Sequence, residues 1–305
     1  MSKKIILALF FALLLVGCNS STNPTSSKSI IVSDDSQSKL QKPVDKSSNT
    51  PRLSPTFKNP VVRTFKPIDG MSKKIPILMY HLLLKKEENT FTNNGIVLNL
   101  ENFQQQMDYL HNNKYTTINL AELEQWLLGN IELPKNSVCI TFDDGYLSSY
   151  IYAYPILKKY NFKAAQFLIT SYVKDKSVKF NPQKQQYLSW QDIIKTTDVF
   201  EYSNHTHNLH KLEGEKGYLI TKPLDIVKKD STKNMELTGS HYFSYPYGHY
   251  NDDVLKLLHK AGIRMAVTVK HGSVKKGDSL LKLKRYGIYP VTTMDTFKQM
   301  LNCEK

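Results

Sequence analysis

From Met71 onward, short apolar runs alternate with longer amphipathic stretches along the chain. The runs are rich in β-branched and aromatic residues and predict seven strands, at residues 75–80, 137–142, 163–170, 200–205, 241–246, 264–269 and 285–289. Between them, apolar residues recur at helical spacing and predict helices, the first two around Phe103, Met107 and Leu110 and around Leu120, Leu123 and Leu127, the others at residues 147–160, 190–196, 223–237, 252–261 and 293–301. Alternation of strands and helices favours a parallel sheet, either open or closed into a barrel.

The amino terminus has a different pattern, which is typical of a secretory signal. Two lysines precede an apolar run at residues 5–16, which is too short to span a bilayer. Leu15-Val16-Gly17-Cys18 resembles the lipobox of bacterial lipoproteins, which implies cleavage before Cys18 and lipid attachment to its thiol. The alternative is an ordinary signal peptide with an incidental cysteine. We therefore expect residues 1–17 to be removed and Cys18 to anchor the chain at the outer face of the cell membrane.

Residues 18–70 have neither helical nor alternating periodicity. Ser, Pro, Lys, Asn and Thr dominate this segment, and such a composition buries too little apolar surface to offset the entropy of ordering. We interpret it as a disordered tether between the lipid anchor and a folded domain at residues 71–305.

Composition and charge narrow the possible functions. Hydrophobic residues at 40% and charged residues at 22% describe a globular chain and exclude a polytopic membrane protein. Three cysteines, at positions 18, 139 and 303, exclude both a full disulfide framework and a cysteine-rich zinc site. The net charge of +14 suits a polyanionic cell surface, and export argues against nucleic acid as a partner. We expect a monomer.

Polar residues follow several of the predicted strands where each strand ends. His81 follows the first, Asp143 and Asp144 the second, His205 the fourth, and Ser244 lies near the end of the fifth. Because parallel strands direct their carboxyl ends to one side, these residues are expected to converge.

The run from Thr141 to Tyr146 places two adjacent carboxylates in a turn that contains Gly145. In such a turn both carboxylates can face one pocket, with one binding a cation while the other stays free. The alternative is a purely structural Asp-Asp-Gly turn, in which the carboxylates cap backbone amides.

Three histidines lie within six residues, at His205, His207 and His210. Packing explains such a cluster poorly, and neutral imidazole is the commonest zinc ligand. One aspartate with two histidines gives three protein ligands and leaves a position open for water, which is the arrangement of a catalytic metal site. A ligand set of one carboxylate and two imidazoles, with no thiolate, favours Zn²⁺, and another divalent transition metal could substitute for it.

These runs together resemble the polysaccharide deacetylases of carbohydrate esterase family 4, which share the NodB-homology domain. The resemblance covers residues 75–301 and rests on the Thr-Phe-Asp-Asp-Gly and His-Thr-x-x-x-His runs, on the Ser-Tyr-Pro-Tyr-Gly run at 244–248 and on Leu-Met-Tyr-His at 78–81. The five-residue spacing of His205 and His210 and the early Met-Tyr-His are similar to the exported poly-N-acetylglucosamine deacetylases. In that clade the fold is a distorted (β/α) barrel, and the motif with the catalytic histidine has moved from the carboxyl-terminal to the amino-terminal part of the domain sequence. The resemblance thus implies an α/β fold with a barrel of about seven parallel strands.

Carried over residue by residue, the resemblance also implies roles in hydrolysis of N-acetyl groups. Asp144, His205 and His210 would bind the metal and Asp143 would be the general base. His81 would be the general acid, and the Tyr247 backbone amide would help to form the oxyanion hole. The implied substrate is a β-linked GlcNAc polysaccharide, either peptidoglycan or poly-N-acetylglucosamine, and the products are acetate and a free amine.

Several points remain open from the sequence. Many family members have an arginine at the position of Ser244 that pairs with the catalytic aspartate, and Arg285 could supply that charge instead. His207 is expected to lie outside the ligand set. Trp190 and Tyr146 suit either a sugar-binding groove or the core. An inactive glycan-binding or metal-binding surface lipoprotein is the alternative function.

Overall fold

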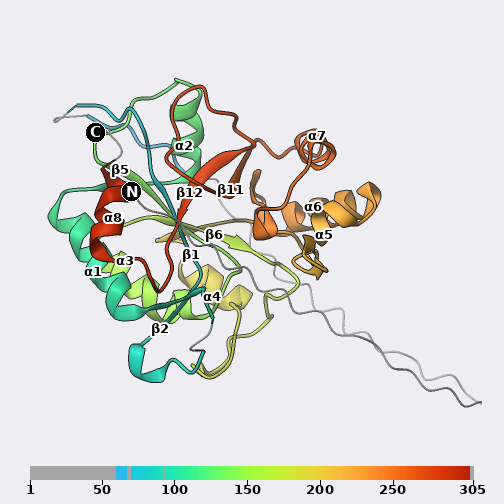
Figure 1. The fold of residues 1–305 in the computed structure, drawn as a ribbon, viewed down its shortest axis with the longest axis horizontal. Coiled ribbons are helices and arrows are strands. Elements are labelled where there is room, and N and C mark those ends of the chain that lie inside the picture. Colours follow the sequence, from blue (N-terminus) through green and yellow to red (C-terminus); the bar gives the residue numbers. More distant parts are fainter. Residues whose placement is uncertain (1–59, 67–69, 92–93, 303–305) are drawn as a thin grey trace, which may run out of the picture. The chain divides into compact units, whose positions relative to one another are not determined.

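Seven parallel strands close into a barrel in this computed structural model, which describes residues 60–66, 70–91 and 94–302 (Figure 1). The strands follow the order β1 (Ile77–Tyr80), β12 (Leu283–Gly287), β11 (Met265–His271), β10 (Tyr242–Ser244), β7 (Phe200–Asn204), β6 (Ala164–Leu168) and β5 (Ser137–Phe142). β5 pairs in turn with β1, in parallel, and so closes the barrel. All seven are strands that the sequence predicts, and the prediction of a distorted (β/α) barrel is confirmed. The predicted signal, Cys18 and most of the predicted tether lie outside the described residues.

One further strand, β4 (Thr116–Ile118), was not predicted and shows how the barrel is distorted. It pairs with the first half of β5, at Ser137–Cys139, whereas β6 pairs with the second half, at Thr141 and Phe142. Two strands therefore share one edge of β5, and β4 lies outside the closed ring.

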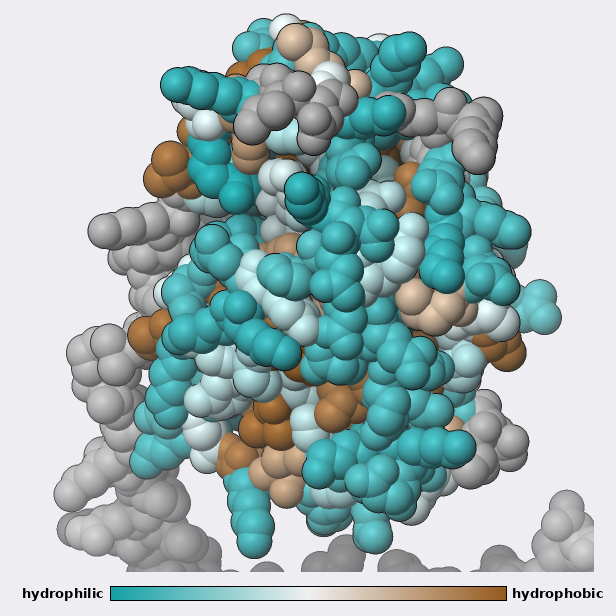
Figure 2. All heavy atoms as spheres, turned by 90° about the vertical axis from the view of Figure 1, so that its left-hand side faces the viewer, coloured by the Kyte–Doolittle hydropathy of each residue, from teal (hydrophilic) through white to brown (hydrophobic). Residues whose placement is uncertain are grey.

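Helices surround the barrel on its outer side and bury their apolar faces against it. Leu78, Val138 and Ile140 belong to one core cluster with residues of α1 (Leu100–Asn112), α3 (Tyr154–Lys159), α4 (Trp190–Lys195) and α8 (Met294–Leu301). α6 (Leu224–Thr238) and α7 (Asp252–Lys260) pack against β10 and β11 in a second cluster. The face seen in Figure 2 is mostly hydrophilic with small apolar groups, as expected for amphipathic helices with one buried face.

Alternate residues of the strands fill a separate cluster that includes Ile77, Cys139 and Phe167. α2 (Leu120–Leu127) contributes Leu123 and Trp126 to the same cluster. The backbone N–H of Leu120, the first residue of α2, donates to the Glu201 carboxylate near the start of β7. α2 therefore lies at the amino-terminal end of the barrel and leaves the carboxyl-terminal end for the site.

The remaining elements are short. The helix predicted at residues 147–160 begins as the π-helical η2 (Ser149–Ala153) and continues as α3. The small pieces are the parallel pair β2 (Leu82–Leu84) and β3 (Val97–Asn99), the antiparallel pair β8 (Leu212–Glu213) and β9 (Lys216–Gly217), α5 (Tyr218–Thr221), and the 3₁₀ turns η1 (Lys86–Glu88) and η3 (Pro246–Gly248). Within the described ranges, no helix has the length and apolar character needed to cross a membrane.

The folded body begins before the predicted boundary at Met71. Arg63 binds the fully buried Glu122 of α2 through its Nε at 2.6 Å and its Nη2 at 2.7 Å, and Nη2 also donates to the Thr117 carbonyl. The Asn119 side chain donates to the Val61 carbonyl. Residues 60–66 thus form a strap, so called below, that is fastened near α2 at the amino-terminal end of the barrel.

Candidate metal centre and active site

The polar residues predicted at the strand ends come together at the carboxyl-terminal end of the barrel. His81 follows β1, Asp143 follows β5 and His205 follows β7, while Ser244 is the last residue of β10. The Asp143 N–H donates to the Tyr80 carbonyl at 2.9 Å, which joins the ends of β1 and β5. Four separate strands therefore position the site.

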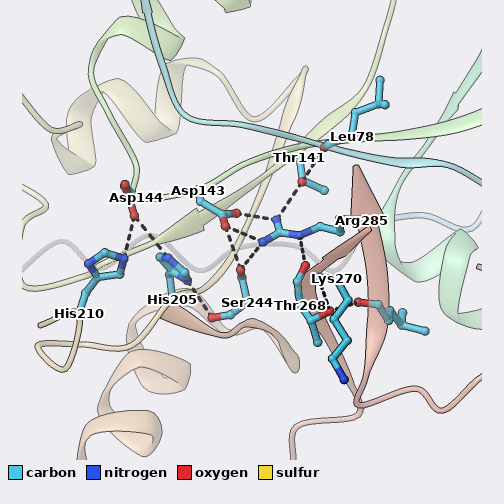
Figure 3. A network of polar contacts seen from close by, with 11 residues as sticks. Leu78, Thr141, Asp143, Asp144, His205, His210, Ser244, Thr268, Lys270 and Arg285 are labelled. Carbon is cyan, nitrogen blue, oxygen red and sulfur yellow. Dashed lines mark hydrogen bonds and ion pairs between the residues drawn. The ribbon is translucent and has the colours of Figure 1, made fainter. Parts of the chain in front are cut away.

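The Asp-Asp-Gly turn separates the two carboxylates by an unusual backbone conformation. Asp144 has a φ of 73° and Gly145 a φ of 76°, both in the left-handed region. A Cβ on Gly145 would lie 2.7 Å from Cδ2 of Leu168, so glycine, which also tolerates the positive φ, avoids strain in this turn. As a result, Asp143 points toward Arg285, whereas Asp144 points toward the histidines (Figure 3).

Asp144, His205 and His210 form a cluster whose geometry fits a metal ion. The Asp144 Oδ1 lies 3.3 Å from Nε2 of His205 and 3.2 Å from Nε2 of His210, and one ligand atom from each residue lies within 4.8 Å of the others. Oδ1 is buried and accepts no hydrogen bond from the described residues, which is costly for a carboxylate unless something else binds it. One oxygen and two imidazole nitrogens make a three-ligand set suited to a divalent transition metal.

Neighbouring groups orient the side chains of this cluster and shift their pKa values. The Nδ1 of His205 lies 2.7 Å from the Ser244 carbonyl, so Nδ1–H donates and Nε2 keeps its lone pair for the centre. Burial alone would raise the pKa of Asp144, but its 3.3 Å contact with His205 and the charges of the nearby histidines lower it to about 2. Burial and the adjacent His205 lower the pKa of His210 to about 4, which keeps its imidazole neutral, the form that binds metals.

His207 lies outside this cluster, as predicted. Its Nδ1 is 2.9 Å from Oγ1 of Thr170, and its carbonyl accepts the Ser171 N–H at 2.9 Å. The Asp230 carboxylate accepts the N–H groups of His207 and Asn208, both at 2.7 Å. The third histidine of the run therefore belongs to the loop framework.

Asp143 is held by Arg285 of β12, which supplies the charge absent at Ser244. Its two oxygens accept Nη1–H and Nη2–H of Arg285 at 2.8 and 2.7 Å, and Oδ2 also accepts the Ser244 hydroxyl at 3.0 Å (Figure 3). Although burial would raise the pKa of Asp143, the Arg285 guanidinium holds it well below its usual range.

The Arg285 guanidinium is itself fully buried and saturated. Besides Asp143, its N–H groups donate to the Thr268 carbonyl, the Thr141 hydroxyl and the Ser244 hydroxyl, at 2.9, 3.1 and 2.9 Å. All five of its N–H groups thus have acceptors. The sequence offered no signal for the contribution of Thr141 and Thr268, because both look like ordinary strand residues.

His81 lies half-buried at the same end of the barrel. Burial lowers its pKa, and the charges of Asp144 and Asp143 act in the opposite direction. Its Nδ1 is buried without a hydrogen-bond partner in the described chain. An imidazole near two carboxylates with an unused nitrogen can donate or accept a proton at this site.

The loop after β10 brings Tyr247 against His210 of this cluster. Tyr247 has a φ of 57°, and its ring packs on the His210 ring with centroids 4.5 Å apart. The next two amides, of Gly248 and His249, donate to the carbonyls of Tyr245 and Pro246. The Tyr247 N–H has no such backbone acceptor in the described chain and can serve an incoming oxygen.

The structure also assigns the two aromatic residues that the sequence left open. Trp190 is 6% exposed and belongs to the core cluster beneath α4, so its role is packing. Tyr146 is 5% exposed and stacks on Tyr187, a residue that the sequence analysis did not single out.

Comparison with known proteins identifies a family. The model of the polysaccharide deacetylase family matches residues 130–266. YxkH of Bacillus subtilis, which carries the same family name, is 30% identical over 220 residues, covering 71% of this chain and 72% of YxkH. The poly-beta-1,6-N-acetyl-D-glucosamine N-deacetylase of Staphylococcus epidermidis is 33% identical over 150 residues, covering 47% of this chain and about half, 51%, of that protein.

A solved structure gives the same result for the fold. The Streptococcus pyogenes deacetylase PplD, in complex with acetate, superposes with a TM-score of 0.65 at 27% identity, covering 75% of this chain and 98% of PplD.

Proposed function

The chain belongs to the polysaccharide deacetylase family, and from this premise we propose that it is a metal-dependent N-deacetylase of a GlcNAc polymer outside the cell. The observation that carries the proposal is the convergence of Asp144, His205 and His210 beside an aspartate that Arg285 keeps ionised. Three ligands and one separate carboxylate are what hydrolysis needs, whereas metal storage needs no free carboxylate.

The residues divide the chemistry among them. Asp144, His205 and His210 would hold a divalent cation, and the bound cation would acidify water and polarise the acetamide carbonyl. Asp143 takes the proton of the attacking water, in an orientation fixed by Arg285 and Ser244. The Tyr247 N–H donates to the carbonyl oxygen as negative charge develops there, a type of contact worth roughly 3 kcal/mol.

Departure of the amine completes the reaction. The leaving nitrogen is a poor leaving group until it is protonated, and His81 lies at the same end of the barrel with an unused ring nitrogen. His81 gives its proton to this nitrogen, so that acetate and a glucosamine amine leave the site. Zn²⁺ is our choice of metal, with Co²⁺, Ni²⁺ or Mn²⁺ as substitutes.

We place the enzyme on the outer face of the cell membrane through lipidated Cys18. The support is the basic and apolar amino terminus that ends in Leu-Val-Gly-Cys. The segment that follows would let a monomeric catalytic domain reach polymer away from the membrane.

Acetate release from a panel of polymers tests the proposal. We expect the metal-loaded protein to release acetate from poly-β-1,6-GlcNAc, peptidoglycan or chitin oligomers, with appearance of free amines, and not from acetylated xylan. Chelation should stop the release and added Zn²⁺ should restore it. Polymer binding without acetate release by the metal-loaded protein would contradict the proposal and support the alternative of an inactive glycan-binding lipoprotein.

A further inference from the structure

Three tyrosines outside the proposed mechanism form a cluster beside the metal ligands. Tyr187 stacks on Tyr146 with ring centroids 5.2 Å apart and an interplanar angle of 21°, and it contacts Tyr172 at 4.7 Å and 56°. Tyr146 is buried, whereas Tyr172 and Tyr187 are both half-buried. Tyr146 therefore backs Tyr187, and both Tyr172 and Tyr187 keep part of their surface open to solvent.

Backbone contacts fix this cluster next to the Asp-Asp-Gly turn. Tyr146 and Tyr187 form an antiparallel bridge, with Leu188 N–H donating to the Gly145 carbonyl at 2.9 Å and Leu147 N–H donating to the Gln186 carbonyl at 2.8 Å. Burial and then the charge of Asp144 raise the pKa of Tyr187 to about 12, consistent with a ring near the metal ligand.

A fourth tyrosine approaches the same metal ligands from another loop. Tyr247 is 38% exposed and packs on His210. Burial, followed by the charges of Asp144 and Tyr172, raises the pKa of Tyr247. Aromatic rings from the loop after β6 and from the loop after β10 thus lie near Asp144 and His210, respectively.

The loop after β6 is also fastened to the loop of the metal histidines. Thr170 N–H donates to the Thr206 carbonyl, Ser171 N–H donates to the His207 carbonyl, and the Thr170 hydroxyl bonds to Nδ1 of His207. Tyr172 is only two residues beyond Thr170, so His207 ties the start of the tyrosine loop to the metal site. Rigid placement of this kind suits a binding surface, because little order remains to be gained on binding.

We propose that Tyr172 and Tyr187 form a stacking platform for a sugar ring next to the one whose acetamide is hydrolysed. Pyranose rings present apolar C–H faces that pack on aromatic faces, while the tyrosine hydroxyls stay in water. The platform makes the enzyme selective for oligomers over monosaccharides. This inference rests on the proposed function and specifies the form of its substrate.

Kinetics on substrates of increasing length test the platform. Tyr187→Ala and Tyr172→Ala are compared with wild type on GlcNAc oligomers of one to five units and on 4-nitrophenyl acetate, an ester without a sugar. We expect each variant to lose roughly 3- to 10-fold in kcat/KM on the pentamer, mainly through KM, as one aromatic contact would predict. Activity on the small ester and zinc content should stay unchanged, and Tyr187→Phe should behave as wild type.

The control removes a tyrosine of similar burial from the outside of the molecule. Tyr154 is half-buried on α3 and packs against Tyr150, so Tyr154→Ala should leave kcat/KM on the pentamer unchanged. Wild-type kinetics in Tyr187→Ala, or an equal loss on ester and pentamer, would overturn the platform.

A binding measurement separates failure of the platform from failure of the proposed function. If wild type releases no acetate from any oligomer, the deacetylase proposal fails, and the pentamer is titrated into the intact protein by calorimetry. Weaker binding by Tyr187→Ala than by Tyr154→Ala would then still support the platform. Equal binding by the two variants, or no binding by wild type, would overturn it.

Discussion

The two ends of the barrel both contain buried carboxylates, but they satisfy them differently. At the amino-terminal end Arg63 binds Glu122 through two nitrogens, and Glu124 accepts hydrogen bonds from Arg264 and from the Tyr242 hydroxyl. Each of these two carboxylates has an arginine partner from a distant part of the chain.

At the carboxyl-terminal end only one of two adjacent carboxylates is satisfied in this way. Asp143 is saturated by Arg285 and Ser244, whereas Asp144 faces two imidazole nitrogens and its Oδ1 accepts no hydrogen bond within the described residues. Buried polar groups are nearly always paired, so the unpaired acceptor is the informative one. The carboxylates paired with arginine contribute to the stability of the barrel. Hydrogen-bond acceptors that converge without a donor indicate a site for a bound cation.

The largest expected effect is the loss of the metal from the unpaired cluster. Asp144→Asn and His210→Ala each remove one of three ligands, so bound zinc measured by atomic emission should fall well below one per chain. Acetate release should fall by more than the roughly 10- to 100-fold that loss of an outer-shell partner causes. His207→Ala is the matched control and should keep its zinc. Zinc loss in His207→Ala would show that His207 is itself a metal ligand.

The next effect separates the base from the ligands. Asp143→Asn keeps the ligand set and should keep zinc, while acetate release falls by about 100-fold or more, the usual scale for a positioned base. The structure adds a cost in stability, because the fully buried Arg285 loses its counter-charge. Breaking a buried pair costs about 3–5 kcal/mol, which denaturant unfolding would detect. If Asp143→Asn kept full stability but lost zinc, Asp143 would be the metal ligand and Asp144 the base.

The sequence predicts the strands of the barrel well, because most of them contain a short run rich in apolar residues that is buried in the structure, as in β1, β5 and β6. It missed β4, whose Thr-Thr-Ile is too short for a period to appear. It also placed residues 60–66 in the tether, because the contact that orders them joins Arg63 to Glu122, 59 positions away. The convergence of Asp144, His205 and His210 was predictable from the strand ends, whereas the bonds of Thr268 and Thr141 to Arg285 depend on barrel closure.

A smaller effect is expected at the amino-terminal end, and on stability alone. Arg63→Ala leaves Glu122 buried without its guanidinium, although one oxygen still accepts the Asn119 N–H. Because Arg63 is 37% exposed, we expect a loss of about 2 kcal/mol in the free energy of unfolding, below the value for a fully buried pair. Zinc content and kcat should stay as in wild type.

The matched control is an exposed pair. Lys229 and Asp225 are 78% and 66% exposed on α6, so Lys229→Ala should change the free energy of unfolding by less than about 0.5 kcal/mol. A fall in kcat/KM in Arg63→Ala without a change in stability would show that the amino-terminal end of the barrel influences the active site. The contrast between a structural end and a catalytic end of the barrel would then be wrong.

The smallest effect concerns Glu201, a carboxyl at the amino-terminal end that has no cationic partner among the described residues. Glu201 accepts the Leu120 N–H at 2.6 Å and lines a cavity of about 790 Å³ beside the strap. Burial raises its pKa from 4.5 to about 8, which outweighs the opposing hydrogen bond. Its contribution to stability is therefore complete below pH 4.5 and is lost as the pH rises to about 8.

Glu201→Gln should remove this pH dependence, because the amide oxygen still accepts the Leu120 N–H and carries no charge at any pH. Between pH 5 and pH 8, a fully buried carboxyl with this pKa would change the free energy of unfolding by about 4 kcal/mol. Because the cavity lets solvent screen the Glu201 carboxylate, we expect a change of about 1 kcal/mol. The measurement is the difference in free energy of unfolding between variant and wild type at pH 5 and at pH 8, which cancels groups that titrate equally in both. The variant should gain stability relative to wild type as the pH rises. A difference independent of pH would mean that Glu201 is ionised in the folded protein and that a cation balances it, as at Glu122 and Glu124.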